Sequence, residues 1–97
     1  MVGHAGENVR VLRHEQTHFD LAEVFARRMR ERFDDMPAAC AQPDGRLRAI
    51  AKQIVDDLKA MQQRYDRETN HGLIDDRQAA WNTDVARMLT ASRRYAQ

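Results

Sequence analysis

Two histidines separated by three residues are the feature of this sequence best suited to chemistry. They begin and end the string His14-Glu15-Gln16-Thr17-His18, an HExxH pattern. Residues four apart on a helix are neighbours on its surface, so the two imidazoles can converge on one metal ion. Glu15 is offset from that face and would reach past the metal, where a general base is needed. The pattern therefore predicts a Zn²⁺ site with His14 and His18 as ligands and Glu15 as the catalytic carboxylate.

A second polar cluster offers the remaining ligand of such a site. A catalytic zinc takes three protein ligands and leaves one position for water. Residues 65–72 read Tyr-Asp-Arg-Glu-Thr-Asn-His-Gly, and we predict His71 as the third ligand. Glu68 and Asp66 are the alternatives, because carboxylates also bind zinc, and the one that does not bind could orient a histidine. Tyr65 is expected either to pack in the core or to donate a hydrogen bond to a developing oxyanion.

The elements that must position these residues are helices. Three segments show helical periodicity and no useful stretch alternates apolar and polar residues, so we expect an all-α bundle with helices at about 7–34, 46–70 and 75–95. Gly72 suits the left-handed position that commonly closes a helix. The chain of 97 residues is long enough for one small domain.

Each helix carries one stripe of residues at steps of three and four, which should face its neighbours. The three stripes are Val11, His14, His18, Leu21 and Phe25 in the first helix; Leu47, Ile50, Ile54, Leu58, Met61 and Tyr65 in the second; and Gln78, Trp81, Val85, Met88, Ser92 and Tyr95 in the third. The first stripe places both histidines inward. The apolar members of all three stripes are expected to form the core.

Charge and composition exclude several classes of function. Sixteen Lys and Arg are balanced by fifteen Asp and Glu, giving a net charge of +1, so we expect no nucleic-acid partner. No segment approaches the ~20 consecutive apolar residues of a membrane span, and the charged N-terminus is unlike a signal peptide. Cys40 is the only cysteine, which excludes an intrachain disulfide.

Taken together, the two motifs resemble a known family. Residues 13–27, which contain HExxH, are followed by the Tyr-Asp-x-x-Thr-x-His-Gly block and then by Gln78 and Trp81. This order resembles the predicted secreted zinc-dependent proteases of bacteria, a domain-of-unknown-function family, over residues 10 to about 85. The resemblance implies that His14 and His18 bind Zn²⁺, that Glu15 is catalytic and that the second block completes the site.

The same resemblance implies a longer protein. Family members carry a signal sequence and a β-rich region ahead of the HExxH helix, whereas this helix begins almost at Met1. We therefore expect residues 1–97 to be one metallopeptidase-like helical domain. It is either the C-terminal part of a longer protein, which the resemblance implies is secreted or periplasmic, or a genuine short homologue that has lost catalysis. The expected function is zinc-dependent hydrolysis of peptide or protein substrates. The alternative is a non-catalytic helical interaction module with a structural or vestigial metal site.

Overall fold

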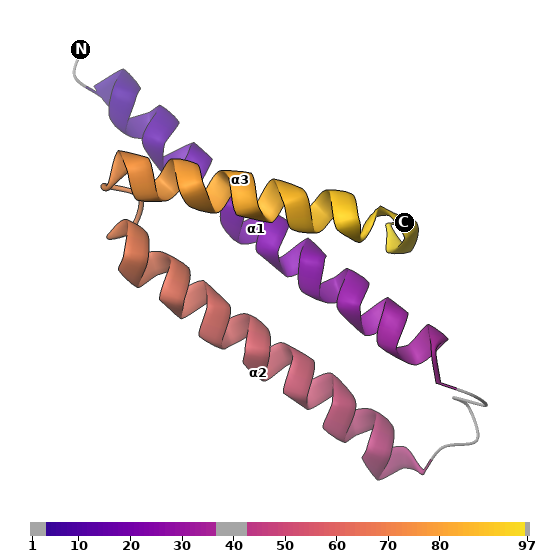
Figure 1. Cartoon of the computed structure of the whole chain (residues 1–97). Helices are drawn as coiled ribbons and strands as arrows, with labels where there is room; N and C mark the ends of the chain where they lie inside the picture. Colours follow the sequence, from indigo (N-terminus) through magenta and orange to yellow (C-terminus); the bar gives the residue numbers. More distant parts are fainter. Residues whose placement is uncertain (1–3, 37–42, 97) are drawn as a thin grey trace.

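A computed structural model describes residues 4–36 and 43–96 of the chain (Figure 1). Its elements are α1 (His4–Asp34), α2 (Asp44–Thr69), α3 (Asp75–Ala91) and the 3-10 turn η2 (Arg93–Tyr95). These described residues contain no strand, and the predicted all-α fold of three helices is confirmed. Cys40 lies outside them.

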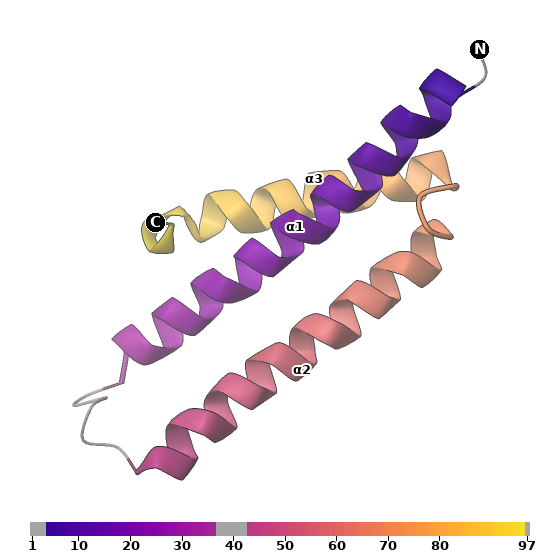
Figure 2. The same cartoon turned by 180° about the vertical axis from the view of Figure 1, so that it is seen from behind.

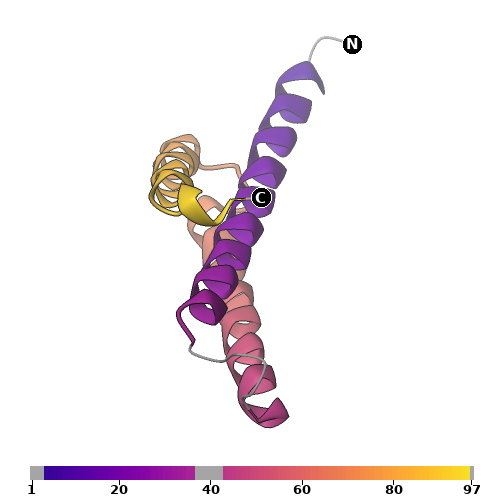
Figure 3. The same ribbon diagram turned by 90° about the vertical axis from the view of Figure 1, so that its right-hand side faces the viewer.

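Two of the helices form a hairpin, and the third covers one side of it. α1 and α2 run antiparallel, and α3 crosses α1 on one face of the pair (Figure 1). Viewed along another direction, α3 stands to one side of the α1 and α2 layer (Figure 3). The result is an elongated molecule measuring 59 × 24 × 22 Å.

The core lies where all three helices meet, in the C-terminal half of α2 and the middle of α1. Its buried members are Leu21, Val24, Phe25, Tyr65, Trp81 and Val85, with Ile54, Leu58, Met61, Met88 and Leu89 packed against them. Most of these residues belong to the predicted stripes, so helical periodicity identified the core face of each helix. Full burial of one such side chain contributes roughly 1.5–3 kcal/mol.

The first stripe faces inward only from His14 onward. Val11, predicted to lie inward, is 59% exposed, and residues 6–13 are all exposed. This part of α1 extends beyond the start of α3, as Figure 2 shows from the side opposite to α3. An apolar position on a helix is buried only where another element covers it, and none of the described elements covers residues 6–13.

A left-handed turn joins α2 to α3. Asn70 caps α2 with a φ of 47°, and His71 and Gly72 follow with φ values of 57° and 91°. The predicted left-handed conformation of Gly72 is therefore confirmed. Main-chain N–H groups of His71 and Ile74 donate to the carbonyls of Asp66 and Thr69 at 2.9 and 3.0 Å, which satisfies the end of α2.

Within the part of the chain that the structure describes, no helix is both long enough and apolar enough to cross a bilayer.

Candidate metal centre

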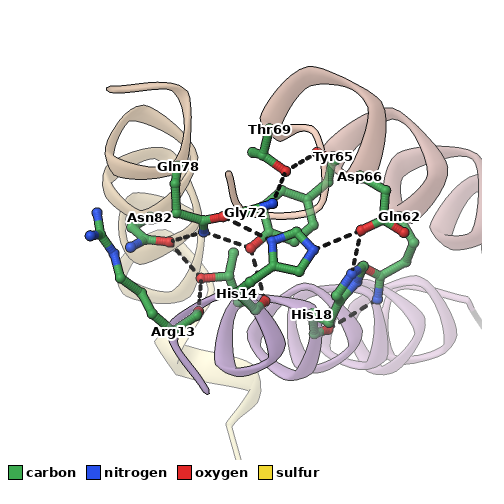
Figure 4. Close-up of polar contacts among 11 residues, drawn as sticks. Arg13, His14, His18, Gln62, Tyr65, Asp66, Thr69, Gly72, Gln78 and Asn82 are labelled. Atoms are coloured by element: carbon green, nitrogen blue, oxygen red, sulfur yellow. Dashed lines mark hydrogen bonds and ion pairs between the residues drawn. The ribbon is translucent and has the colours of Figure 1, made fainter. Parts of the chain in front are cut away.

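His14 and His18 meet the carboxylate of Asp66 across the interface of α1 and α2. The Nε2 atoms of His14 and His18 lie 2.8 and 2.7 Å from the same oxygen, Asp66 Oδ1 (Figure 4). Antiparallel packing explains the meeting, because α2 returns along α1 and places Asp66 beside the HExxH turn. The HExxH histidines are therefore brought together with one of the two predicted alternative carboxylates.

The other two predicted ligands lie elsewhere. Among the described residues, the group that could hold a metal consists of His14, His18 and Asp66, with ligand atoms within 4.8 Å of one another. His71 is exposed in the left-handed turn. Glu68 accepts hydrogen bonds from Arg64 Nε at 2.6 Å and from Trp81 Nε1 at 3.1 Å. The structure thus brings Asp66, and neither His71 nor Glu68, to the histidine pair.

Gln62 determines which nitrogen of His18 faces Asp66. Its amide nitrogen donates to the main-chain carbonyl of His18 at 3.0 Å. Its carbonyl oxygen must then face His18 Nδ1, with which it forms a short hydrogen bond. The network therefore assigns a proton to Nδ1 and leaves Nε2 for Asp66, or for a metal ion.

Gln78 orients the ring of His14 in the same way, and Tyr65 fixes the orientation of the Gln78 amide. The Tyr65 hydroxyl donates to the His14 carbonyl at 2.8 Å and accepts from the Gln78 amide nitrogen at 2.6 Å. The Gln78 carbonyl oxygen then accepts from His14 Nδ1 at 2.8 Å. With each Nδ1 bonded to a glutamine oxygen, each Nε2 is the nitrogen that faces Asp66.

The ring of Tyr65 packs against both imidazoles. Its side chain is fully buried, its ring stacks on His14 with centroids 4.5 Å apart, and it forms a T-shaped pair with the ring of His18, with centroids 4.7 Å apart. Burial raises the pKa of Tyr65, hydrogen bonds with Gln78 and Thr17 lower it in part, and the charges of Asp66 and Glu15 raise it further. Because its single proton is donated to the His14 carbonyl, the arrangement favours packing, and the oxyanion role stays a prediction.

Gly72 closes the site behind His14. A Cβ atom at position 72 would lie 3.0 Å from the Cβ and 3.1 Å from the Cγ of His14, closer than side chains pack. The positive φ of Gly72 adds a second reason for glycine at this position. The lack of a side chain at residue 72 therefore lets the turn after α2 approach the imidazole without displacing it.

Asp66 is ionised in this environment. Burial alone would raise its pKa, but hydrogen bonds and charge interactions with His14 and His18 outweigh burial and hold the pKa below its usual value. A carboxylate with a full negative charge beside two imidazole nitrogens is a donor set suited to a divalent cation. The cluster is thus compatible with a metal site.

The site is closed on the side of His14 and open on the side of Asp66. The side chains of His14, His18 and Asp66 are 5%, 21% and 32% exposed. Beside His18 lies a shallow hollow of about 250 Å³, lined by Glu15, His18, Phe19, Ala22 and Gln62. Glu15 is exposed and borders this open side, so its carboxylate can meet water or a ligand there.

No role was predicted for Gln62, and Gln78 was predicted only as a member of the third stripe and of the pattern that resembles the family. A usable signal existed for Gln62. Gln62 and Asp66 are four residues apart on α2, as His14 and His18 are on α1. Two such pairs on antiparallel helices can face each other in register, and here they do.

A comparison with protein families identifies the relationship. The sequence model described as "Bacterial protein of unknown function (DUF922)" matches residues 9–72, about two thirds of the chain. The chain belongs to this family. The DUF922 match contains His14, His18 and Asp66 and ends at Gly72, before α3. No curated protein and no solved structure matches the chain.

Proposed function

We propose that this protein binds Zn²⁺ through His14, His18 and Asp66 and hydrolyses peptide bonds, with Glu15 as the general base. One observation carries the proposal: two imidazole Nε2 atoms converge on one carboxylate oxygen while a glutamine occupies each Nδ1. Asp66 replaces His71 as the third ligand in this proposal, because only Asp66 lies beside the histidine pair.

The chemistry of the donor set fits zinc. Histidine nitrogen and aspartate oxygen are common zinc ligands, and three protein ligands leave a position for water. Hydrogen bonds to the far nitrogen of a ligating histidine fix its tautomer and its orientation, as Gln62 and Gln78 would do here. Two histidines and one carboxylate also suit Fe²⁺. The adjacent Glu15, in the position of the HExxH carboxylate, favours the hydrolytic metal.

The residues around the ion would have separate tasks. A zinc ion lowers the pKa of its bound water to about 7, which supplies a nucleophile at neutral pH. Glu15 would accept a proton on a carboxylate oxygen from the attacking water and deliver it to the leaving amine. Tyr65, Gln62 and Gln78 would hold the histidine rings in place, so that both Nε2 atoms face the same point beside Asp66.

A second candidate is a helical interaction module whose metal site is structural. Val9, Val11 and Leu12 in the overhanging part of α1 are 64%, 59% and 68% exposed. Neighbouring exposed apolar side chains on a surface are typical of a contact with another protein. In this case the protein would bind metal without cleaving peptides.

Metal analysis of purified variants tests the proposal. We expect about one zinc, and no iron, per chain of the unmodified protein under a three-ligand site. The Asp66→Ala variant should lose the metal, and His71→Ala should retain it as the matched control. Metal bound equally by both variants would contradict the ligand assignment.

A cleavage assay tests the catalytic part separately. Glu15→Gln should retain zinc and lose hydrolysis of a labelled unfolded protein such as casein, because the amide cannot accept a proton. Exposed Gln16→Glu is a control one position along α1 that leaves the ligand set unchanged. Zinc binding without cleavage by the unmodified protein would favour the interaction module.

A further inference from the structure

An apolar groove runs along the hairpin on the side away from α3. Its volume is about 400 Å³, and none of its lining residues comes from α3. The small side chains of Ala22 and Ala26 lie between the larger groups that form its walls. Eight of its nine lining residues are apolar and the ninth is Arg30; the apolar ones include Ala22, Ala26, Met29 and Phe33 of α1 and Val55 and Leu58 of α2.

The groove adjoins the hollow beside the candidate metal centre. Ala22 lines both the groove and the hollow beside Glu15 and His18. On α1 the residues that follow Glu15 along this face succeed one another at steps of four and three: Phe19, Ala22, Ala26, Met29 and Phe33. Such steps trace one stripe of a helix, so a single surface leads from the general base into the groove.

Large apolar side chains border this surface without cover. Phe19 is 72% exposed and Val55 is 40% exposed, one on each helix. Single exposed apolar residues are common, but apolar residues on both sides of one groove indicate a surface that becomes covered by a ligand.

We propose that this groove binds the substrate, and that the substrate class is unfolded polypeptide with apolar side chains on one side of the cleaved bond. The proposal rests on the proposed function for the cleavage itself, whereas the binding does not require zinc. Residues 15–33 of a helix span roughly 27 Å, which is the length of about eight residues of extended peptide.

The open form of the groove favours a peptide over an acyl chain. A peptide in an open groove can bury alternate side chains while its main-chain N–H and C=O groups remain in water. An acyl chain is apolar on all sides and would leave one side exposed. The occupant to which we commit is therefore an extended peptide.

Peptide binding tests the inference without relying on catalysis. The Glu15→Gln full-length chain is titrated into a fluorescein-labelled peptide of about eight residues with leucine at alternate positions, and anisotropy is measured. A second peptide carries aspartate in place of leucine. We expect the leucine peptide to bind at least about tenfold more tightly, because a carboxylate is costly to bury in an apolar groove.

Two pairs of variants locate the binding. Val55→Glu should weaken binding of the leucine peptide by about tenfold or more, whereas Leu73→Glu, at another exposed apolar residue outside the groove, should change it by less than about twofold. Ala26→Trp should fill the groove and have the same effect as Val55→Glu. Exposed Ala79→Trp is its control.

Three results would overturn the inference: no preference for the leucine peptide, equal effects of the groove and control variants, or displacement of the peptide by dodecanoate at lower concentration than by unlabelled peptide. Zinc content of the same samples separates the two proposals. Zinc without peptide binding rejects the groove alone. Peptide binding that depends on Val55 and Ala26 in a protein without zinc rejects the metal site and supports the groove.

Discussion

Gln62 contacts His18 at two points, donating to its main-chain carbonyl at 3.0 Å and accepting from its ring Nδ1. A flip of the His18 ring would therefore break its hydrogen bond with the Gln62 carbonyl oxygen. The other contact, from the Gln62 amide nitrogen to the main chain, keeps that oxygen facing the ring. Because one contact is to the main chain of α1, the same side chain fixes the register of α1 against α2 at the site.

Loss of this double contact should weaken metal binding. We expect Gln62→Leu to lower zinc affinity by about 10–100-fold, the usual effect of removing a group that orients a ligating histidine. Competition with a chromogenic chelator measures the change. Gln63→Leu, at the exposed neighbouring position, should have little effect. Equal affinities of the two variants would contradict a role for Gln62 in orienting His18.

Zinc should stabilise the fold. A ligand that binds only the folded state at a thousand times its Kd contributes about 4 kcal/mol, and each kcal/mol raises the Tm of a domain of this size by roughly 4–8 °C. Thermal unfolding with excess zinc, and again after addition of a chelator, should therefore differ by more than about 10 °C. The Asp66→Ala variant should show no such difference, and a matching rise in that variant would mean that zinc binds elsewhere.

Two glycines should respond to alanine in opposite directions. Gly72→Ala places a methyl group 3.0 Å from His14 Cβ at a φ of 91°, so we expect a loss of about 1–3 kcal/mol in unfolding free energy and weaker zinc binding. Gly45 lies in α2 with nothing near its added Cβ, and Gly45→Ala should stabilise by about 0.5–1 kcal/mol. Denaturant titration measures both. A stable Gly72→Ala variant with unchanged zinc affinity would contradict the close approach to His14.

Glu23 should make the free energy of unfolding decrease at acidic pH. The hydrogen bond from Arg27 lowers its pKa most, burial opposes this, and Arg30 lowers it further. The two arginines also donate to the carbonyls of Leu89 and Tyr95 at 2.8 and 2.7 Å, which connects α1 to the end of the chain. A carboxyl group whose pKa is lower in the folded state stabilises the fold. This stability is fully present above the pKa of the unfolded state, about 4.3, and is lost as the pH falls through the pKa of the folded state.

The Tm difference between the unmodified protein and Glu23→Gln should thus be largest near neutral pH and shrink below about pH 4. Salt should reduce the difference, because these groups are partly exposed. Glu31→Gln, at an exposed position on the same helix, is the control. A difference that grows on acidification would show the wrong sign for this network.

Periodicity was sufficient to predict the helices, because each element carries one stripe with a strong spacing of three and four. The same spacing misplaced Val11, whose burial depends on how far α3 extends and not on α1 itself. Local sequence therefore predicted the face of each helix, whereas the extent of the core depended on the arrangement of the three.

The histidine pair was predictable, whereas the sequence left three candidates for its partner: His71, Glu68 and Asp66. HExxH specifies His14 and His18 by spacing within one helix, but the choice between Asp66 and His71 depends on the φ values of the turn that follows α2. Asn70, His71 and Gly72 all adopt positive φ values, and this leaves the His71 side chain in solvent. Whether Asp66 binds metal stays a prediction for the experiments above.

Gln78 comes from α3, beyond the segment that matches DUF922, while all three candidate ligands lie inside that segment. The ligands and the amide that steadies His14 are therefore encoded in separate stretches of the chain. Substitutions after residue 72 can change how rigidly His14 is held while the identity of the ligands stays the same. For the proposed metal site, substitutions in α3 should therefore change the affinity for an ion without changing the ligands that select it.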